Sequence, residues 1–167
     1  MRRLRYQVAV SLDGFIAGPD DDASWIAMDP DIDFAALFAQ FDTFLMGRRT
    51  WEVSGAMVGG GRVVVVSTTL DQVANPSVTV FADDVAARVQ SLKEEPGKDI
   101  WLFGGGELFR SLLAAGLVDT VEPAIIPVLL GGGTRFLPDP AVRKGLTLTG
   151  HRVYATTGIV LLEYAVS

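Results

Sequence analysis

Short runs of apolar and β-branched residues recur along the chain, separated by longer and more polar segments. These runs predict strands at residues 4–10, 43–46, 63–67, 78–81, 100–103, 120–126, 146–154 and 158–165. Two of them, "RVVVVS" and "IWLF", are apolar almost without interruption, which is typical of strands covered on both faces. The pattern therefore predicts a sheet that lies between two other layers.

Helical spacing of apolar residues marks three of the intervening segments. In 33–42 the apolar positions fall at i, i+3, i+4 and i+7 and are occupied by Phe34, Leu37, Phe38 and Phe41. Segments 83–95 and 107–116 carry similar stripes, and a Pro-Gly pair or a glycine marks the end of each. A further short helix is expected to open at Thr50. We expect all of these apolar faces to pack on the sheet.

Strands and helices alternate through most of the chain, and a hairpin closes it. Alternation of this kind implies crossover connections and therefore mostly parallel strands. The last two strand runs are joined by a short turn near 155–158, which predicts an antiparallel edge. The expected fold is a single three-layer α/β domain over residues 1–167.

Composition narrows the classes of function. The 167 residues are 49% hydrophobic, and 14 basic against 20 acidic residues give a formal net charge of −6, which argues against a nucleic-acid partner. The chain has no cysteine, which excludes disulfides and thiol nucleophiles, and His151 is its one histidine, so no metal centre is expected. No apolar stretch is long enough for a membrane span and no secretory signal is evident, so a cytoplasmic protein is expected.

The turn "GRRT" at residues 47–50 is the first candidate for chemistry. Ligands of open α/β sheets bind beyond the carboxyl ends of the strands. Gly47 lets a ligand approach the main chain closely, and Arg48 or Arg49 can donate paired hydrogen bonds to a phosphate. The alternative is an ordinary turn with exposed arginines.

Two further turns follow buried strand runs. Ser67, Thr68 and Thr69 place three hydroxyls after "VVVV", where they can bind an anion or cap the next element. In "LFGGGELF" the glycines at 104–106 precede a helix start, and free main-chain N–H groups there can bind a diphosphate. The spacing matches neither a GxGxxG fingerprint nor a P-loop.

The stretch "VAVSLDGFIAG", residues 8–18, indicates a loop over the sheet edge. Its strand breaks at Ser11 and turns at Asp13 into a long acidic loop. Such a loop can cover a ligand, and Trp25 further along it can stack on a planar ring. A surface loop with one packed tryptophan is the alternative. The glycine triplet at 131–133 is interpreted as a bulged turn.

Five segments, taken in chain order, resemble dihydrofolate-reductase-like proteins: "AVSLDGFIAG", "DTFLMGRRTWE", "VVVVSTT", "IWLFGGGELFRSLLAAGLVD" and "PVLLGGGTRFLP". The similarity is greatest to the reductase (C-terminal) domain of the bifunctional riboflavin-biosynthesis deaminase–reductase, and it covers nearly the whole chain. The resemblance implies an oxidoreductase with an eight-stranded, mostly parallel sheet and NADPH across its carboxyl edge. Relatives of this type are often homodimers.

Matched position by position, the resemblance assigns the cofactor contacts to several turns. The adenosine and pyrophosphate side corresponds to Gly47, Arg48, Arg49 and Thr50, and the 2′-phosphate side to Ser67, Thr68 and Thr69. A glycine pair that often forms a cis peptide corresponds to Gly104 and Gly105, and the diphosphate corresponds to Gly106, Glu107 and Leu108. The nicotinamide side corresponds to Ile16, Ala17 and Phe109.

The substrate side has fewer matches. Ser11 and Asp13 match the mobile loop of the family, and a carboxylate that opens the first long helix matches the pterin-holding residue. Asp29, Asp31 and Asp33 lie in that region, and the catalytic candidates are Asp13 and Asp31, with helix capping as the alternative for Asp31 or Asp33. The residues expected to line the substrate pocket are Ser11, Trp25, Phe34 and Phe38.

Two departures from the family bear on the substrate. Glu107 stands where many dihydrofolate reductases have an arginine, which removes one phosphate contact. The segment after Met46 lacks the "DDPxLxxR" pattern of the riboflavin reductases, which argues against a phosphoribosylaminopyrimidine substrate. The preferred hypothesis is an NADPH-dependent reductase of a small planar heterocycle, pterin- or pyrimidine-like. A nucleotide-binding module without turnover and a reductase with a flavin-type carrier stay open as alternatives.

Overall fold

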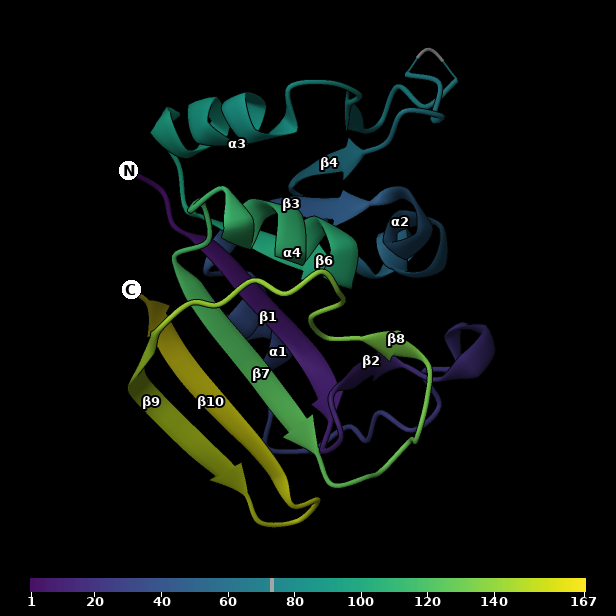
Figure 1. Ribbon diagram of the computed structural model, residues 1–167, viewed down its shortest axis with the longest axis vertical. Coiled ribbons are helices and arrows are strands. Elements are labelled where there is room, and N and C mark those ends of the chain that lie inside the picture. The colour runs from purple at the N-terminus through teal and green to yellow at the C-terminus, as the bar shows by residue number, and fades with distance from the viewer. Residues whose placement is uncertain (73) are drawn as a thin grey trace.

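An eight-stranded sheet organises the molecule. The computed structural model describes residues 1–72 and 74–167, and within these ranges the sheet contains β1 (Leu4–Ser11), β3 (Phe41–Gly47), β4 (Arg62–Val66), β5 (Thr79–Phe81), β6 (Asp99–Gly104), β7 (Thr120–Ile126), β9 (Leu146–Tyr154) and β10 (Ile159–Val166). The strand order is β5-β4-β3-β6-β1-β7-β10-β9 (Figure 1). Strand β1 therefore lies inside the sheet, between β6 and β7.

Pairing is parallel from β5 through to β7 and antiparallel at the C-terminal edge. Strands β6 and β7 both run in the direction of β1, whereas β10 runs against β7 and β9 runs against β10. Crossover connections impose the parallel part, and the closing hairpin imposes the antiparallel edge. The predicted α/β fold, with its mostly parallel eight-stranded sheet and antiparallel C-terminal edge, is confirmed.

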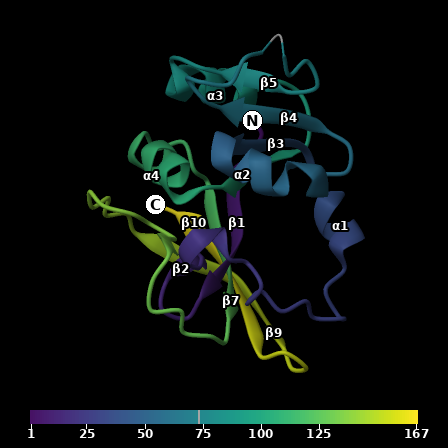
Figure 2. The same ribbon diagram turned by 90° about the vertical axis from the view of Figure 1, so that its right-hand side faces the viewer.

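Helices cover both faces of the sheet. Helices α3 (Val85–Glu94) and α4 (Gly106–Ala114) lie on one face, and α1 (Phe34–Phe38) lies on the other, as Figure 2 shows. Helix α2 (Arg48–Ser54) lies at the end of β3 and is followed by a short 3-10 helix, η2 (Gly55–Met57). No helix in the described ranges is long and apolar enough to cross a membrane.

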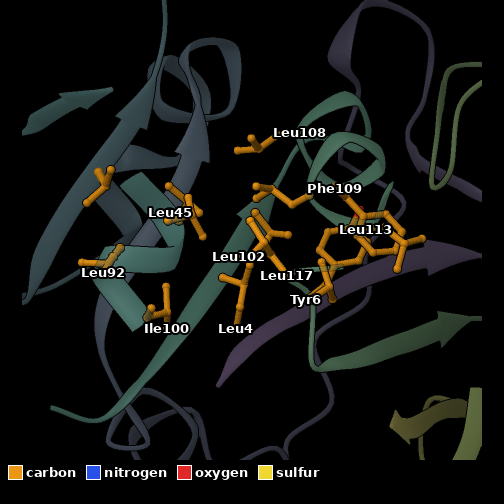
Figure 3. Close-up of a cluster of buried hydrophobic side chains, with 14 of the residues drawn as sticks. Leu4, Tyr6, Leu45, Leu92, Ile100, Leu102, Leu108, Phe109, Leu113 and Leu117 are labelled. Carbon is orange, nitrogen blue, oxygen red and sulfur yellow. The ribbon is translucent and has the colours of Figure 1, made fainter. Parts of the chain in front are cut away.

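The largest hydrophobic core lies between the sheet and helices α3 and α4 (Figure 3). Alternate residues of β1, Leu4 and Tyr6, are fully buried there because successive side chains of a strand point to opposite faces. The expected stripes of α3 and α4 supply the other side of this core, through residues such as Leu92 and Leu112. The aromatic rings of Tyr6 and Phe109 stack with their centroids 3.8 Å apart.

Two helix boundaries differ from the prediction. Helix α1 has 5 residues, and Phe41, which was expected to continue its stripe, begins β3 instead and packs its ring 4.9 Å from Trp101. The pairing of Phe41 with Asp99 in β6 outweighs the helical periodicity. Helix α2 begins at Arg48 rather than at Thr50, so the two arginines occupy its first turn.

A small two-stranded sheet was not predicted. Strand β2 (Phe15–Ala17) pairs antiparallel with β8 (Thr134–Arg135), and neither strand is longer than 3 residues. Such short strands carry no measurable periodicity, so pattern reasoning passes over them. Their pairing fixes the 131–135 segment beside the loop that follows β1, at the carboxyl edge of the main sheet.

Candidate active site

A cleft of about 900 Å³ runs across the carboxyl ends of β1, β3 and β6. The parallel pairing of these strands brings their ends to one edge, so turns far apart in the sequence meet there. Most of the residues predicted to contact a cofactor line this cleft, namely Ile16, Ala17, Gly47, Arg48, Arg49, Thr50, Gly104, Gly105, Gly106, Glu107 and Leu108.

Glycines leave the main chain open where the turns after β3 and β6 meet. A Cβ added to Gly47 would lie 4.0 Å from the main-chain nitrogen of Gly105, and one added to Gly104 or Gly105 would approach Thr50 Oγ1 to within 3.6 Å and 3.5 Å. The peptide bond between Gly104 and Gly105 is cis, as the resemblance implied. These are ordinary van der Waals distances, so a Cβ would fit between the turns but would cover cleft surface; at Gly104 the φ of +137° favours glycine as well.

The first turn of α4 offers main-chain donors to the cleft. Gly105 occupies the N-cap position, and no side chain caps the helix there. The first N–H groups of an α-helix have no partner within the helix, and here they belong to residues that line the cleft, such as Glu107 and Leu108. This helix end therefore suits a negatively charged group.

Three arginines and two acidic residues line the cleft, in contrast to the acidic composition of the whole chain. Arg49 forms an ion pair of 2.7 Å with Asp21, and Arg110 pairs with Glu107 at 3.3 Å. The side chain of Glu107 is 74% exposed, so its carboxylate lies toward solvent and Arg110 partly neutralises it. The local balance is positive, which favours an anionic ligand.

Arg48 connects α2 with the turn after β4. Its Nε donates to Glu52 at 2.7 Å, and its Nη1 donates to the hydroxyl of Thr69 at 2.6 Å. Ser67, Thr68 and Thr69, the hydroxyl residues expected at the 2′-phosphate, do not line the cleft. Thr69 is the one that accepts the hydrogen bond from Arg48. The Ser67 hydroxyl accepts from the main-chain N–H groups of Thr69 and Leu70, so it stabilises the turn. Thr68 is exposed.

The carboxylate of Asp13 is held by a loop and lines neither this cleft nor the adjoining cavity. It accepts hydrogen bonds from the Ser11 hydroxyl at 2.6 Å and from the main-chain N–H groups of Leu130 and Gly131. These hydrogen bonds, the one from Ser11 first, lower the pKa of Asp13 to about 2. The contacts suit a residue that positions loops, and its assignment as a catalytic group stays a prediction that they do not support.

A second cavity of about 340 Å³ adjoins the cleft on the α1 side of the sheet. Gln7, Met28 and Trp101 are among the residues that line both spaces. Phe34 lines the second cavity as predicted, whereas Phe38 packs its ring 5.1 Å from that of Trp101 and does not line it.

The other predicted substrate residues lie outside both spaces. Trp25 donates its indole N–H to the main-chain oxygen of Asp22 and packs on the core cluster around Ile126 and Tyr154. Asp31 is exposed. Helix α1 is capped by Asp33, which accepts from the main-chain N–H of Ala36, so the capping alternative considered for Asp31 or Asp33 holds for Asp33.

Two further site predictions meet a different environment in the structure. Asp29 is buried, and a hydrogen bond from the Thr157 hydroxyl is the first cause that lowers the pKa of its carboxyl group. Phe109 is 1% exposed and stacks on Tyr6 in the core, so it does not reach the cleft. An amphipathic stripe does not reveal which of its edge residues faces a ligand.

Sequence reasoning missed the apolar wall of the cleft. Met28, Val53 and Met57 all line it, although each is a large apolar side chain that stays more than half exposed. Exposed apolar side chains gathered at a concave surface are typical of a ligand site. Gln7 was missed as well, although a polar residue in the apolar run "YQVAV" was a detectable signal. Among the described residues, no cluster of His, Asp and Glu side chains could hold a metal ion.

A mostly parallel α/β sheet with a glycine-lined cleft across its carboxyl edge defines the class of dihydrofolate-reductase-like domains. More specifically, the chain belongs to the RibD C-terminal domain family, whose model matches residues 2–161. It is 33% identical over 179 aligned positions to the uncharacterized protein YyaP of Bacillus subtilis (strain 168), an alignment that covers 98% of this chain and 94% of YyaP.

Solved structures show the same fold. The chain matches RibD of Acinetobacter baumannii with a TM-score of 0.79 at 16% identity, over 100% of this chain and 58% of that protein. It matches the dihydrofolate reductase of Enterococcus faecalis, solved as a complex with NADP(H), with a TM-score of 0.69 at 17% identity, over 99% and 96% of the two chains. The chain thus has the architecture of the reductase domains.

Proposed function

We propose that this protein is an NADPH-dependent reductase that transfers a hydride to a small planar heterocycle, pterin- or pyrimidine-like. One observation carries the proposal: the predicted cofactor turns meet at the carboxyl-edge cleft, and a second, smaller cavity adjoins it and shares six lining residues with it. Two connected spaces of unequal size suit an extended dinucleotide and a compact acceptor. Membership of the RibD C-terminal domain family supports the same reading.

The residues of the cleft fit a dinucleotide phosphate. The diphosphate would lie against the glycines at 104–106 and the uncapped N-terminus of α4, where N–H groups are free to donate. Thr50 Oγ1 lies beside the same glycines and adds a hydroxyl donor. These donors would bind the diphosphate through hydrogen bonds and the dipole of α4.

Arg48 is the side chain best placed for the 2′-phosphate of NADPH. Its guanidinium lies between Glu52 and the hydroxyl of Thr69, at the end of the cleft formed by α2. A phosphate dianion competes well with one exposed carboxylate for a guanidinium, because bidentate phosphate contacts are strong. Arg49 is directed instead at Asp21, in the loop after β2.

The nicotinamide end would lie near Ile16 and Ala17, which line the cleft. When bound, NADPH supplies the hydride, and the protein contributes position and exclusion of water. The apolar side chains of Val8 and Met28 line both spaces and keep their junction poor in water. Asp13 and Asp29 line neither space and are engaged in loop hydrogen bonds. The proton for the acceptor would therefore come from solvent or from Asp33 or Glu163, the carboxylates that line the second cavity.

A nucleotide-binding module without turnover is the second candidate. It is favoured by this same engagement of Asp13 and Asp29, since neither carboxylate is free to deliver a proton. Turnover separates the two candidates directly. Steady oxidation of NADPH in the presence of a dihydropterin or an aminopyrimidine supports the reductase, and tight NADPH binding without any oxidation supports the module.

Thermal stabilisation tests the identity of the cofactor. A ligand that binds only the native state raises the melting temperature by mass action. We expect saturating NADPH to give a larger shift than NADH, and FMN to give none. A shift with FMN and none with NADPH would reject the nicotinamide cofactor and favour a flavin-type carrier.

A further inference from the structure

The side-chain oxygen of Gln7 is a buried acceptor without a partner. Among the described residues it accepts no hydrogen bond, and it is one of two such buried side-chain atoms, the other being the Tyr6 hydroxyl. Buried polar atoms in folded proteins are nearly always hydrogen-bonded, because an unmatched one loses its hydration without compensation. Oε1 itself has almost no accessible surface, so a ligand can reach it only after the carboxamide turns about its last side-chain torsion, and because Oε1 has no partner in the described part of the chain this turn breaks no hydrogen bond made by that oxygen.

The neighbours of Gln7 have no donor to spare for it. Arg5, two positions earlier on the same face of β1, donates to both carboxylate oxygens of Glu122 and to Gln40 Oε1. Glu122 pairs with Gln7 in the register between β1 and β7, but a carboxylate cannot donate. The indole N–H of Trp101 donates to the main-chain oxygen of Gln7 at 2.9 Å. The polar network around Gln7 is complete without its side chain.

Gln7 also lies where the cleft and the second cavity adjoin. Six residues line both the cleft and the second cavity, and these are Gln7, Val8, Ala9, Ile26, Met28 and Trp101. Because the Trp101 N–H is already bonded, Gln7 carries the one uncommitted polar side chain among these six residues. A substrate in the second cavity whose ring reaches the cleft must pass this carboxamide.

We propose that Gln7 is a specificity-determining residue that reads the lactam edge of a heterocyclic substrate. Its Oε1 accepts from a ring N–H, and its Nε2 donates to the adjacent ring carbonyl, so one carboxamide matches one cyclic amide. The substrate class is then a planar heterocycle that carries N–H and C=O side by side, as pterins and uracils do. This inference rests on the proposed function, since it places the hydride acceptor in the second cavity.

Binding of matched probes to Gln7→Met tests the inference. Methionine keeps the length of the side chain and removes both polar groups. The probes are 7,8-dihydropterin and 5,6-diaminouracil, each paired with its N3-methylated counterpart, titrated by calorimetry with and without saturating NADPH. We expect the variant to bind the better N–H probe at least about tenfold more weakly than the wild type, and the methylated probes with less than about a twofold change.

Two controls separate a lost contact from a damaged fold. Gln7→Met removes an unmatched buried acceptor, so its melting temperature without ligands should be no lower than that of the wild type. Gln90→Met, on α3 at a position that lines neither space, should leave probe affinity unchanged. Gln7→Glu keeps acceptor oxygens at this position and should retain more N–H probe affinity than Gln7→Met.

Each contrary result has a distinct meaning. The inference is overturned if the wild type and Gln7→Met bind the N–H probes with equal affinity, or if no probe binds to the wild type. In either case, NADPH binding by the wild type would leave the proposed cofactor site in place. Weaker NADPH binding by Gln7→Met also overturns it, since Oε1 then serves the carboxamide of the nicotinamide. Failure of the wild type to bind NADPH overturns the proposed function, whatever the probes do.

Discussion

The carboxylate of Asp13 accepts a hydrogen bond of 2.7 Å from the main-chain N–H of Gly131, 118 residues further along the chain. The same carboxylate accepts from the N–H of Leu130, and the main-chain oxygen of Gly14 accepts from Phe136. These contacts join the loop after β1 to the segment 129–136, which was interpreted from sequence as a bulged turn. The two segments therefore form one edge of the cleft, and Asp13 joins them together with the Gly14 contact and the β2–β8 pairing.

Replacement of Asp13 by asparagine should loosen this edge without unfolding the sheet. The amide keeps one acceptor oxygen, but it loses the charge that strengthens hydrogen bonds from three donors. We expect hydrogen exchange at Leu130 and Gly131 to accelerate by about tenfold or more, with exchange in β1 unchanged. Asp20→Asn, an exposed neighbour in the chain, is the control, and equal exchange in both variants would contradict the role of Asp13.

The same contacts predict how the loop edge responds to acid. The pKa of Asp13 is lowered to about 2 from an ordinary value of 3.8, so its charged form is stabilised in the folded state. A lowered pKa contributes stability that is complete above the unfolded value and is lost as the pH falls toward the folded value. Protection of the Leu130 and Gly131 amides should therefore be constant above about pH 5 and decline toward pH 2. Asp13→Asn should lack this decline.

Arg48 and Arg49 should differ in their effect on cofactor choice. Arg48 contacts Thr69 in the turn after β4, whereas Arg49 is paired with Asp21, which also lines the cleft. We expect Arg48→Ala to weaken NADPH binding by about 10- to 100-fold and NADH binding by no more than about threefold. Arg49→Ala should affect both nucleotides alike. Equal weakening of NADPH and NADH by Arg48→Ala would show that Arg48 does not contact the 2′-phosphate.

The third glycine of "GGGELF" is required by packing. A Cβ on Gly106 would overlap the main-chain oxygen of Arg135 and lie 3.1 Å from Pro138 Cδ, and main-chain atoms cannot move away cheaply. We expect Gly106→Ala to lower the free energy of unfolding by about 1–3 kcal/mol, measured by urea denaturation. Gly132→Ala is the matched control, because a Cβ there meets no atom within 4 Å. Equal stability of the two variants would contradict this role.

The turns that line the cleft could be predicted because their signals are local. The glycines at 104–106 and the turn at 47–50 each follow an apolar strand run, and parallel strands bring such turns to one edge. The cis peptide between Gly104 and Gly105 came from family resemblance and is confirmed. Sequence spacing alone does not carry that information.

The substrate half was harder to predict because its contacts are distant in sequence. The partners of Asp13 lie 117 and 118 residues away, so its loop-joining role has no local pattern. Phe38 and Phe109 sit on amphipathic stripes, and the tertiary packing of Trp101 and Tyr6 decides that both turn into the core. Gln7 is identified only because its buried side-chain oxygen has no hydrogen-bond partner among the described residues. Finding this requires the hydrogen bonds of every buried polar group, which a sequence does not give.

The Tyr6 hydroxyl should be removable with a gain in stability. Tyr6 is fully buried, stacks on Phe109, and its hydroxyl donates to none of the described residues. Tyr6→Phe keeps the ring and removes the unmatched group, so we expect the free energy of unfolding at neutral pH to rise by about 1 kcal/mol. Phe109→Leu, which removes the stacked ring, should lower it by at least about 1 kcal/mol.

Alkaline pH should widen the difference between Tyr6→Phe and the wild type. Burial raises the pKa of Tyr6 above its ordinary value of 10.0, so the folded state keeps the hydroxyl protonated where the unfolded chain ionises. Stability is complete below the unfolded pKa and falls as the pH rises through it. Urea denaturation at neutral pH and above about pH 10 should show a gain for Tyr6→Phe that grows with pH. A variant less stable than the wild type at both values would mean that the hydroxyl has a partner in the folded protein.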